Sequence, residues 1–181
     1  MNTHYTSTAK GLHWLMALMI FGLLAMGFYM SDLPFSPEKL QYYSWHKWAG
    51  VTVFMLVWLR LVWRFTHRPP AYPLSMSRLQ QVLAHGGHVL LYGLIIIIPL
   101  SGWLMSSAKG VQTVWFGVLP LPDLLAKDKE LGKQLAELHS ALNIGLLVLI
   151  GGHAAAAFFH HLVHKDDVLR RMLPARSKPT R

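Results

Sequence analysis

The stretch from Leu138 to Val163 reads LHSALNIGLLVLIGGHAAAAFFHHLV and contains no Asp, Glu, Lys or Arg. A helix needs roughly 20 residues to cross a hydrocarbon core about 30 Å thick, so one helix over this stretch can span a bilayer. Three further stretches are equally free of charged residues: Gly11 to Met30, Trp48 to Leu59, and Val82 to Ala108. The sequence therefore predicts four transmembrane helices.

The second stretch is short, but the two arginines that follow it, Arg60 and Arg64, can extend their guanidinium groups to the membrane interface. Composition agrees with membrane burial, because the 181 residues are 53% hydrophobic and only 14% charged. The first stretch is too long for a signal-peptide core and lacks a small-x-small cleavage site, so we expect it to remain as a helix. The fold expected is an all-α, integral membrane four-helix bundle in a single domain, 1–181, with helices at about 8–31, 44–65, 80–107 and 136–164.

Basic residues are distributed unevenly between the two sides of this bundle. Eleven of the 17 Lys and Arg residues fall on one side: Lys10, Arg60, Arg64, Arg68, Arg78, Lys165, Arg170, Arg171, Arg176, Lys178 and Arg181. The other side receives Lys39, Lys47, Lys109, Lys127, Lys129 and Lys133, together with most of the acidic residues. Cytoplasmic loops carry the excess of Lys and Arg, so we expect a multi-pass membrane protein with both termini in the cytoplasm. The net charge of +9 suits contact with anionic membrane lipid, and nucleic acid is not an expected partner.

The outer loop from Lys109 to Glu137 contains an aromatic segment, Val111 to Phe116, that suits the membrane interface. Its later part, from Leu124 to Glu137, is expected to form a short surface helix. The loop from Arg64 to Arg78 holds three prolines and is expected to be an extended connector.

Histidines inside the spans carry the chemical information, because ionisable side chains in a membrane are costly and usually functional. His139 and His153 lie fourteen residues apart on the fourth helix. At about 1.5 Å per residue they are about 21 Å apart along the axis, and fourteen steps of about 100° bring both to one face. A single metal ion cannot bind imidazoles spread over that distance, whereas two haems stacked across a bilayer require ligands at two such depths. Leu146, midway between them, is expected to point into the gap.

Elimination suggests the partner of the outer histidine. Only His46 among the other histidines lies at the outer end of a span, so we expect it to pair with His139. Gly50, one turn further on, would let a porphyrin approach the backbone closely. Arg60 lies fourteen residues after His46 and so shares its face at the inner level, where it either pairs with a propionate of the inner haem or extends to the interface like an ordinary arginine.

The inner partner of His153 stays open on spacing alone, because His13, His85 and His88 all lie near the inner ends of their helices. Three more histidines, His160, His161 and His164, end the fourth helix and form either a proton-handling or quinone-contacting cluster or an ordinary solvated helix end. The chain has no cysteine, which excludes covalently attached haem, iron–sulfur clusters and disulfides. It also lacks a P-loop, a G-x-G-x-x-G and a G-x-S-x-G motif.

Several motifs together resemble the bacterial cytochrome b561 family. They are His13-Trp14, His46-Lys47-Trp48-Ala49-Gly50, Ala84-His85-Gly86-Gly87-His88, Trp115-Phe116-Gly117 and the run from His153 to His161. The resemblance covers nearly the whole chain. It implies a four-helix bundle with two non-covalent b-type haems, the inner one ligated by His13 and His153 and the outer one by His46 and His139. The cytochrome b subunits of formate dehydrogenases and hydrogenases have a similar arrangement.

Iron ligated by two histidines has no open coordination position, so each haem suits the transfer of single electrons. We therefore expect transmembrane electron transfer, with ubiquinone as one terminus and His88, His160 and Lys165 as candidate contacts for it. The resembling family includes superoxide oxidases, which implies superoxide as a donor outside and an oxidoreductase activity. Two alternatives remain: an electron-carrying membrane anchor of a larger redox complex, which takes electrons from a docked redox protein, and a haem-free transporter or structural membrane protein.

Overall fold

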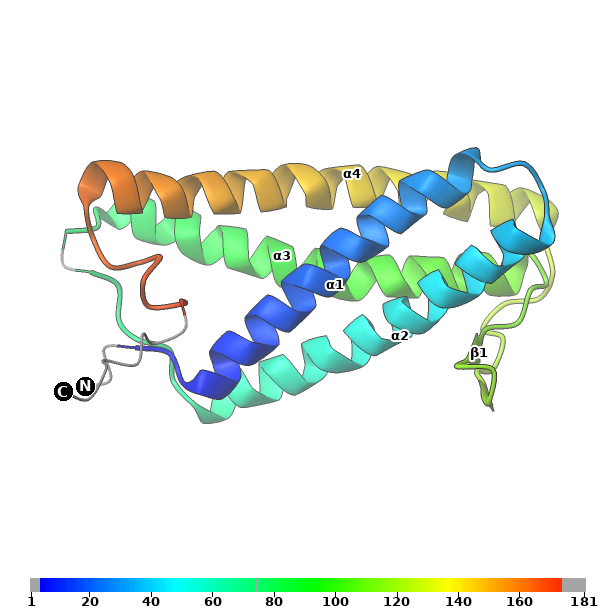
Figure 1. The fold of residues 1–181 in the computed structure, drawn as a ribbon, viewed down its shortest axis with the longest axis horizontal. Helices are drawn as coiled ribbons and strands as arrows, with labels where there is room; N and C mark the ends of the chain where they lie inside the picture. The colour runs from blue at the N-terminus through cyan, green and yellow to red at the C-terminus, as the bar shows by residue number, and fades with distance from the viewer. Residues whose placement is uncertain (1–3, 74, 174–181) are drawn as a thin grey trace, which may run out of the picture.

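The computed structural model describes residues 4–73 and 75–173. Over these residues the fold is all-α, and four of its helices are long and apolar enough to cross a membrane. They are α1 (Ser7–Asp32), α2 (Pro37–Thr66), α3 (Arg78–Ala108) and α4 (Lys129–Phe159), shown in Figure 1. A short π-helix, η1 (His160–His164), continues α4 directly. Three of the basic residues behind the expected orientation, Arg176, Lys178 and Arg181, lie outside the described residues.

The helices start at side-chain caps, which explains two differences from the boundaries expected. The sequence predicts a start at 44 for the second helix, yet α2 begins at Pro37 because Ser36 caps it, accepting a hydrogen bond from the Lys39 amide at 3.2 Å. The fourth helix is predicted from 136, yet α4 begins at Lys129, where Asp128 accepts the amide hydrogens of the next turn. The separate surface helix expected over Leu124 to Glu137 is therefore wrong, since its second half is the start of α4.

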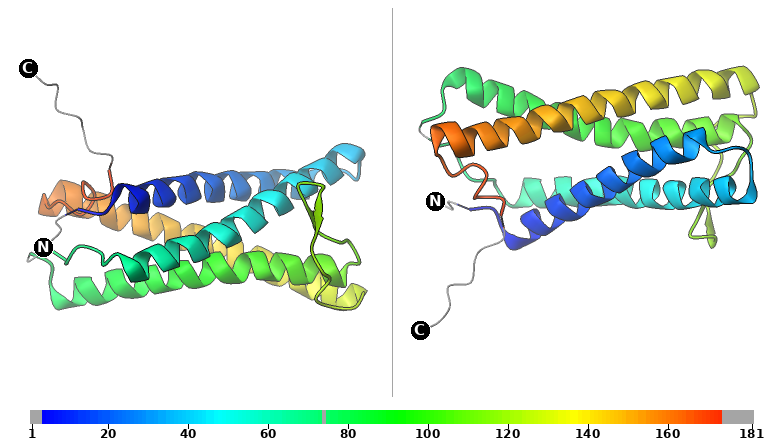
Figure 2. Two further views of the ribbon diagram at one scale, coloured as in Figure 1. Left: turned by 90° about the horizontal axis from the view of Figure 1, so that it is seen from below. Right: turned by 45° about the horizontal axis from the view of Figure 1, so that its top comes forward.

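The helices pack as two pairs, and among the described residues the backbones pack more closely within each pair than between the pairs. The backbone of α1 packs closely along α2, that of α3 along α4, and α2 touches α3. In Figures 1 and 2 the beginning of α1 and the end of α2 lie at the same end of the bundle as the end of α4. We call this the inner end and the opposite one the outer end. Side chains, rather than closely packed backbones, therefore bridge most of the space between α4 and the α1–α2 pair.

A small apolar cluster fills the middle of the bundle between its two ends. Its buried members come from all four long helices: Met16, Ile20, Leu24, Val53, Val57, Ile98 and Leu146. Outward-facing apolar side chains are instead widely exposed, such as Leu18 at 73% and Val148 at 71%. A water-soluble protein rarely shows such a continuous apolar exterior, so this surface fits a lipid environment.

At the outer end a two-stranded hairpin folds back onto α2. Its strands β1 (Val114–Trp115) and β2 (Leu119–Pro120) are antiparallel. The turn requires positive φ at Phe116 and Gly117, 50° and 72°. The indole of Trp48 donates to the Val114 carbonyl at 2.7 Å, and the Trp115 indole donates back to the Trp48 carbonyl at 3.3 Å. These bonds hold the hairpin over α2, two residues from His46.

At the inner end the segment after η1 crosses over to α1 and to the loop between α2 and α3. Trp14 of α1 donates its indole hydrogen to the Met172 carbonyl at 2.9 Å. Lys10 bonds the Leu173 carbonyl at 2.9 Å. The segment thus ties the end of the fourth span to the start of the first.

Candidate functional site

The structure brings four of the histidines together as two pairs. The rings of His46 (α2) and His139 (α4) have centroids 6.4 Å apart, and those of His13 (α1) and His153 (α4) are 6.2 Å apart. Both pairs cross the space between α4 and the α1–α2 pair. Leu146 is 3% exposed in the apolar cluster between the two levels, the position that its spacing predicts. The bundle therefore presents one histidine pair near each end, separated by packed apolar side chains.

The spacing within each pair fits a metal held from two sides. Two imidazoles on opposite sides of one iron each contribute a metal–nitrogen bond of about 2 Å and a nitrogen-to-centroid distance of roughly 1.2 Å, which sets their centroids roughly 6 Å apart. The observed 6.4 Å and 6.2 Å agree with this value. No group of three or more His, Cys, Asp or Glu side chains that could hold a bare metal ion occurs among the described residues. The pairs thus suit a metal that brings its own equatorial ligands, as haem does.

A hydrogen-bond chain from α3 fixes the ring of His139. The Ser101 hydroxyl donates to the Ile98 carbonyl at 2.8 Å, so its oxygen is free to accept from Nδ1 of His139, 2.9 Å away. A ring whose Nδ1 carries the hydrogen presents an unprotonated Nε2, the form that binds a metal. Ser101 is itself buried, at 4% exposed. It therefore both orients His139 and selects its tautomer.

Two glycines give the outer histidines their room. A Cβ added at Gly102 would lie 3.2 Å from Cε1 of His139, and one at Gly27 would lie 3.5 Å from Cε1 of His46. Nδ1 of His46 is buried, and no group in the part of the chain that the structure describes bonds it. At Gly50, where the sequence suggests close approach of a porphyrin, an added Cβ would meet no protein atom within 4 Å. Sequence reasoning missed Ser101, Gly27 and Gly102, because only packing between helices brings them to the histidines.

The inner pair has a cationic neighbour instead. Nη2 of Arg60 lies 3.1 Å from Nδ1 of His13. Arginine has no acceptor, so in this arrangement Nδ1 accepts the bond and Nε2 carries the hydrogen. Binding a metal through Nε2 of His13 requires the opposite tautomer, and hence that Arg60 turn to another acceptor.

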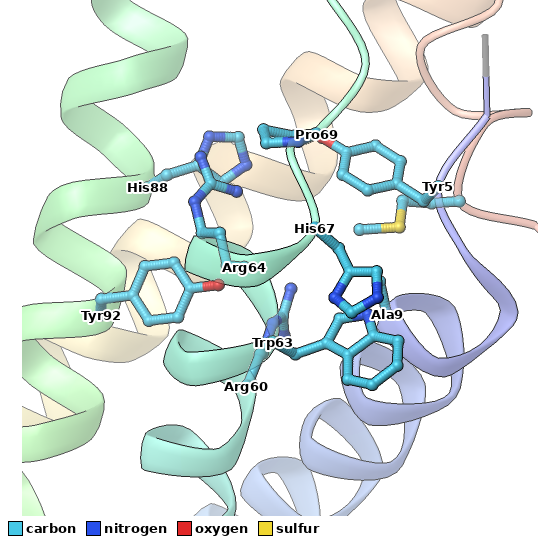
Figure 3. Close-up of a pocket in the computed structure, with 10 residues that line it drawn as sticks. Tyr5, Ala9, Arg60, Trp63, Arg64, His67, Pro69, His88 and Tyr92 are labelled. Carbon is cyan, nitrogen blue, oxygen red and sulfur yellow. The ribbon is translucent and has the colours of Figure 1, made fainter. Parts of the chain in front are cut away.

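A third histidine, His88 of α3, lies near the inner pair, with its ring centroid 5.4 Å from that of His153. It lines an open pocket at the inner end together with Arg60, Arg64 and Tyr92 (Figure 3). The other two candidate quinone contacts, His160 and Lys165, are not among the residues that line this pocket. His160 is buried and its Nδ1 lies 2.6 Å from Oδ2 of Asp166. The side chain of His85, also on α3, is exposed.

The model of a family described as "Prokaryotic cytochrome b561" matches residues 4–175. The chain belongs to the prokaryotic cytochrome b561 family. This cytochrome is 32% identical over 176 residues to "Cytochrome b561 homolog 2" of Escherichia coli (strain K12), a match that covers 93% of this chain and 90% of that protein.

Two further relatives bear on function. "Probable superoxide oxidase CybB" of Yersinia pestis is 28% identical over 179 residues, covering 96% of this chain and 98% of the relative. "Cytochrome b561 homolog 1" of Escherichia coli (strain K12) is 33% identical over 133 residues, 72% of this chain and 74% of the relative. The cytochrome is therefore a multi-pass membrane electron carrier of a family that implies haem b.

Proposed function

We propose that this cytochrome carries electrons across the bacterial inner membrane through two b-type haems. His46 and His139 ligate the outer haem, and His13 and His153 ligate the inner one. The observation that supports this most directly is the pair of ring separations, 6.4 Å and 6.2 Å, at the two ends of one helix face. Both histidines of α4 lie on that face because their fourteen-residue spacing corresponds to almost four full turns.

Haem iron bound by two histidines supplies one-electron oxidation and reduction without an open position for oxygen. The protein's part is to orient the histidines that would bind each haem and to keep the two histidine pairs apart. Ser101 keeps His139 in the metal-binding tautomer. Arg60 lies where it can leave His13 for a carboxylate at the inner level. The apolar cluster around Leu146 keeps water out of the space between the levels.

At the outer end of the bundle the protein accepts electrons from superoxide in the periplasm. The N- and C-termini of the chain lie in the cytoplasm. A relative named as a probable superoxide oxidase supports this donor. Three outer lysines gather near the hairpin: Lys109 is close enough for its charge to act on Lys47, and the Lys127 side chain covers Gly110. Clustered cations attract a small anion, although Asp123 also acts on Lys47 and reduces the local field.

The inner terminus delivers electrons to ubiquinone, which partitions into the bilayer. His88 is the best-supported contact, because its ring centroid lies 5.4 Å from that of His153, a proposed ligand of the inner haem. His160 and Lys165, at the end of α4, are candidates for a second approach to the same region.

A pyridine haemochrome assay tests the ligand set. The wild type is expected to hold two haems per chain. His46→Ala and His139→Ala each lose one, as do His13→Ala and His153→Ala, whereas the exposed His85→Ala keeps both. Retention of two haems in any of the first four variants would contradict the ligation scheme. A purified wild type without a Soret band after haem supplementation would instead support a haem-free transporter or structural membrane protein.

A docked redox protein is a second candidate donor, supported by the apolar tip of the outer hairpin. Val118 is 83% exposed and Phe116 is 56% exposed, which suits either the membrane interface or a protein contact. Stopped-flow mixing separates the donors. Rapid haem reduction by superoxide alone, followed by quinone reduction, supports the oxidase. Sluggish reduction that a soluble cytochrome or dehydrogenase accelerates supports the membrane anchor.

A further inference from the structure

The inner pocket carries a concentration of positive charge without a neutralising acid. Among its lining residues are two arginines, two histidines and two tyrosines, and none of the lining residues is Asp or Glu: Arg60, Arg64, His67, His88, Tyr5 and Tyr92 are the polar ones. The ion pairs among the described residues join His160 to Asp166 and Arg171 to Asp167, so neither pocket arginine has a carboxylate partner there. Cations close to the membrane core are costly unless an anion or dipole compensates them.

Both guanidinium groups are held on one aromatic ring. The guanidinium carbon of Arg60 lies 5.6 Å from the ring centroid of Tyr92, and that of Arg64 lies 6.0 Å from it. Figure 3 shows Arg64 beside His88 and Tyr92, with the arginines coming from α2 and the other two from α3. The ring holds the faces of the two forks in the pocket, so the N–H groups at their edges can bind an acceptor once Arg60 leaves His13.

The position of Arg60 connects this pocket to the inner histidine pair. Arg60 lines the pocket and also contacts His13, and His88 lines it while lying beside His153. Haem has two propionate carboxylates on one edge of its ring, and an arginine fork binds a carboxylate in a bidentate manner. We propose that Arg60 and Arg64, held by Tyr92, bind the propionates of the inner haem in this pocket. The inference rests on the proposed function, and it makes Arg64 and Tyr92 cofactor-positioning residues.

The tautomer of His13 agrees with this assignment. When Arg60 binds a propionate it no longer donates to Nδ1 of His13, so that nitrogen can carry the hydrogen and Nε2 is free for iron. Tyr5, at the pocket edge, is a further donor: burial raises the pKa of its hydroxyl, although the charge of Arg64 acts against this shift. The pocket thus supplies several donors and no carboxylate, as a site for two carboxylates requires.

Haem with methylated propionates provides the sharpest test. The full-length chain, produced without haem, is reconstituted with iron protoporphyrin IX or with its dimethyl ester, and binding is followed by the Soret band. Two bidentate contacts are expected to favour the free acid about tenfold or more in the wild type, since a hydrogen bond to a charged group contributes on the order of one decade in affinity. The ratio of the two affinities should fall towards one in Arg60→Gln/Arg64→Gln.

Two further variants separate charge from geometry. Arg64→Lys keeps the charge but lacks the fork, so its acid-to-ester ratio should be intermediate. Arg68→Gln, outside the pocket lining, should behave like the wild type. Redox titration of each holoprotein provides a second measurement: the double arginine variant should shift the component that His153→Ala removes and leave unchanged the one that His139→Ala removes.

Three results would overturn the proposal. An acid-to-ester ratio that is unchanged in the double variant excludes propionate binding by these arginines. Normal haem behaviour combined with a raised KM for quinol in Arg64→Gln would assign the pocket to the quinone head group instead. A wild type that binds neither porphyrin refutes the haem function itself, which distinguishes that failure from failure of the propionate assignment alone.

Discussion

The two histidine pairs share a helix and a ring spacing but have contrasting surroundings. At the outer pair, α3 supplies a hydroxyl to His139, glycines pack against both rings, and a hairpin lies over α2 beside the pair. At the inner pair, arginines and a third histidine surround an open pocket. The contrast indicates that the outer level is built to hold its ligands in one geometry, whereas the inner level is built for negative charge and for access.

The largest expected effect comes from removing one ligand at each level of α4. In His139→Ala the remaining inner haem should still be reduced by quinol but no longer by superoxide, because the outer entry is lost. In His153→Ala the remaining outer haem should respond to superoxide and not to quinol. Rapid-mixing spectra of the two variants, with His85→Ala as the control, measure this. If both variants respond alike to superoxide and to quinol, superoxide does not act at the outer end and quinol at the inner end as proposed.

The next largest effect is expected from adding atoms at Gly102, which packs against the ring of His139. Gly102→Val places new atoms against the His139 ring, where even a Cβ would lie 3.2 Å from Cε1. The ring sits between α3 and α4 and has little room to shift, so outer haem occupancy should fall several-fold while the inner haem stays. Haem content and redox titration report both. Gly22→Val on the exposed face of α1, where an added Cβ meets nothing within 4 Å, is the matched control.

The outer pair also shows what the sequence could predict. Helix geometry is rigid enough that the spacing of His139 and His153 predicts one shared face, and the depth of His46 predicts its partner. The contribution of Ser101 and Gly102 was not predictable in this way, because it depends on how α3 lies against α4. At the inner pair spacing left three candidates open, and only resemblance to a family favoured His13.

The helix starts were missed for a different reason. Charged residues such as Glu38, Lys39 and Glu130 interrupt the apolar pattern in the first turns of α2 and α4, so hydropathy alone predicts both starts too late. The capping residues Ser36 and Asp128 are the informative signal. A helix begins where a side chain satisfies its free amides, and this position need not coincide with the edge of the membrane. By contrast, the π-helix at the end of α4 has no sequence pattern that would have predicted it.

A smaller effect concerns the tautomer of the outer ligand. Ser101→Ala removes the acceptor for Nδ1 of His139 without adding atoms. Loss of such a supporting bond typically lowers metal affinity about 10- to 100-fold, so haem at the outer level should dissociate about tenfold faster or more. Haem transfer to apomyoglobin measures this rate. Ser44→Ala removes a hydroxyl that donates to the Leu40 carbonyl of its own helix and should leave the rate unchanged. Equal rates in both variants would mean that Ser101 does not orient the ligand.

The smallest effect tests the inner segment that ties α4 to α1. Arg171 pairs with Asp167 at 2.9 Å, and this bond holds the pKa of the Asp167 carboxyl below its ordinary value. A lowered pKa means that the pair stabilises the fold above the unfolded-state pKa of about 3.9 and that the stabilisation is lost as the pH falls through the folded-state value.

Because Asp167 is 44% exposed, Asp167→Asn should cost only about 0.5 kcal/mol or less at pH 7. The difference in Tm between wild type and Asp167→Asn in detergent should shrink as the pH is lowered from 7 to 3. In an Arg171→Gln background Asp167→Asn should have no effect at either pH. A loss that is undiminished at pH 3, or that remains in that background, would mean that Asp167 stabilises the inner segment through contacts other than this ion pair.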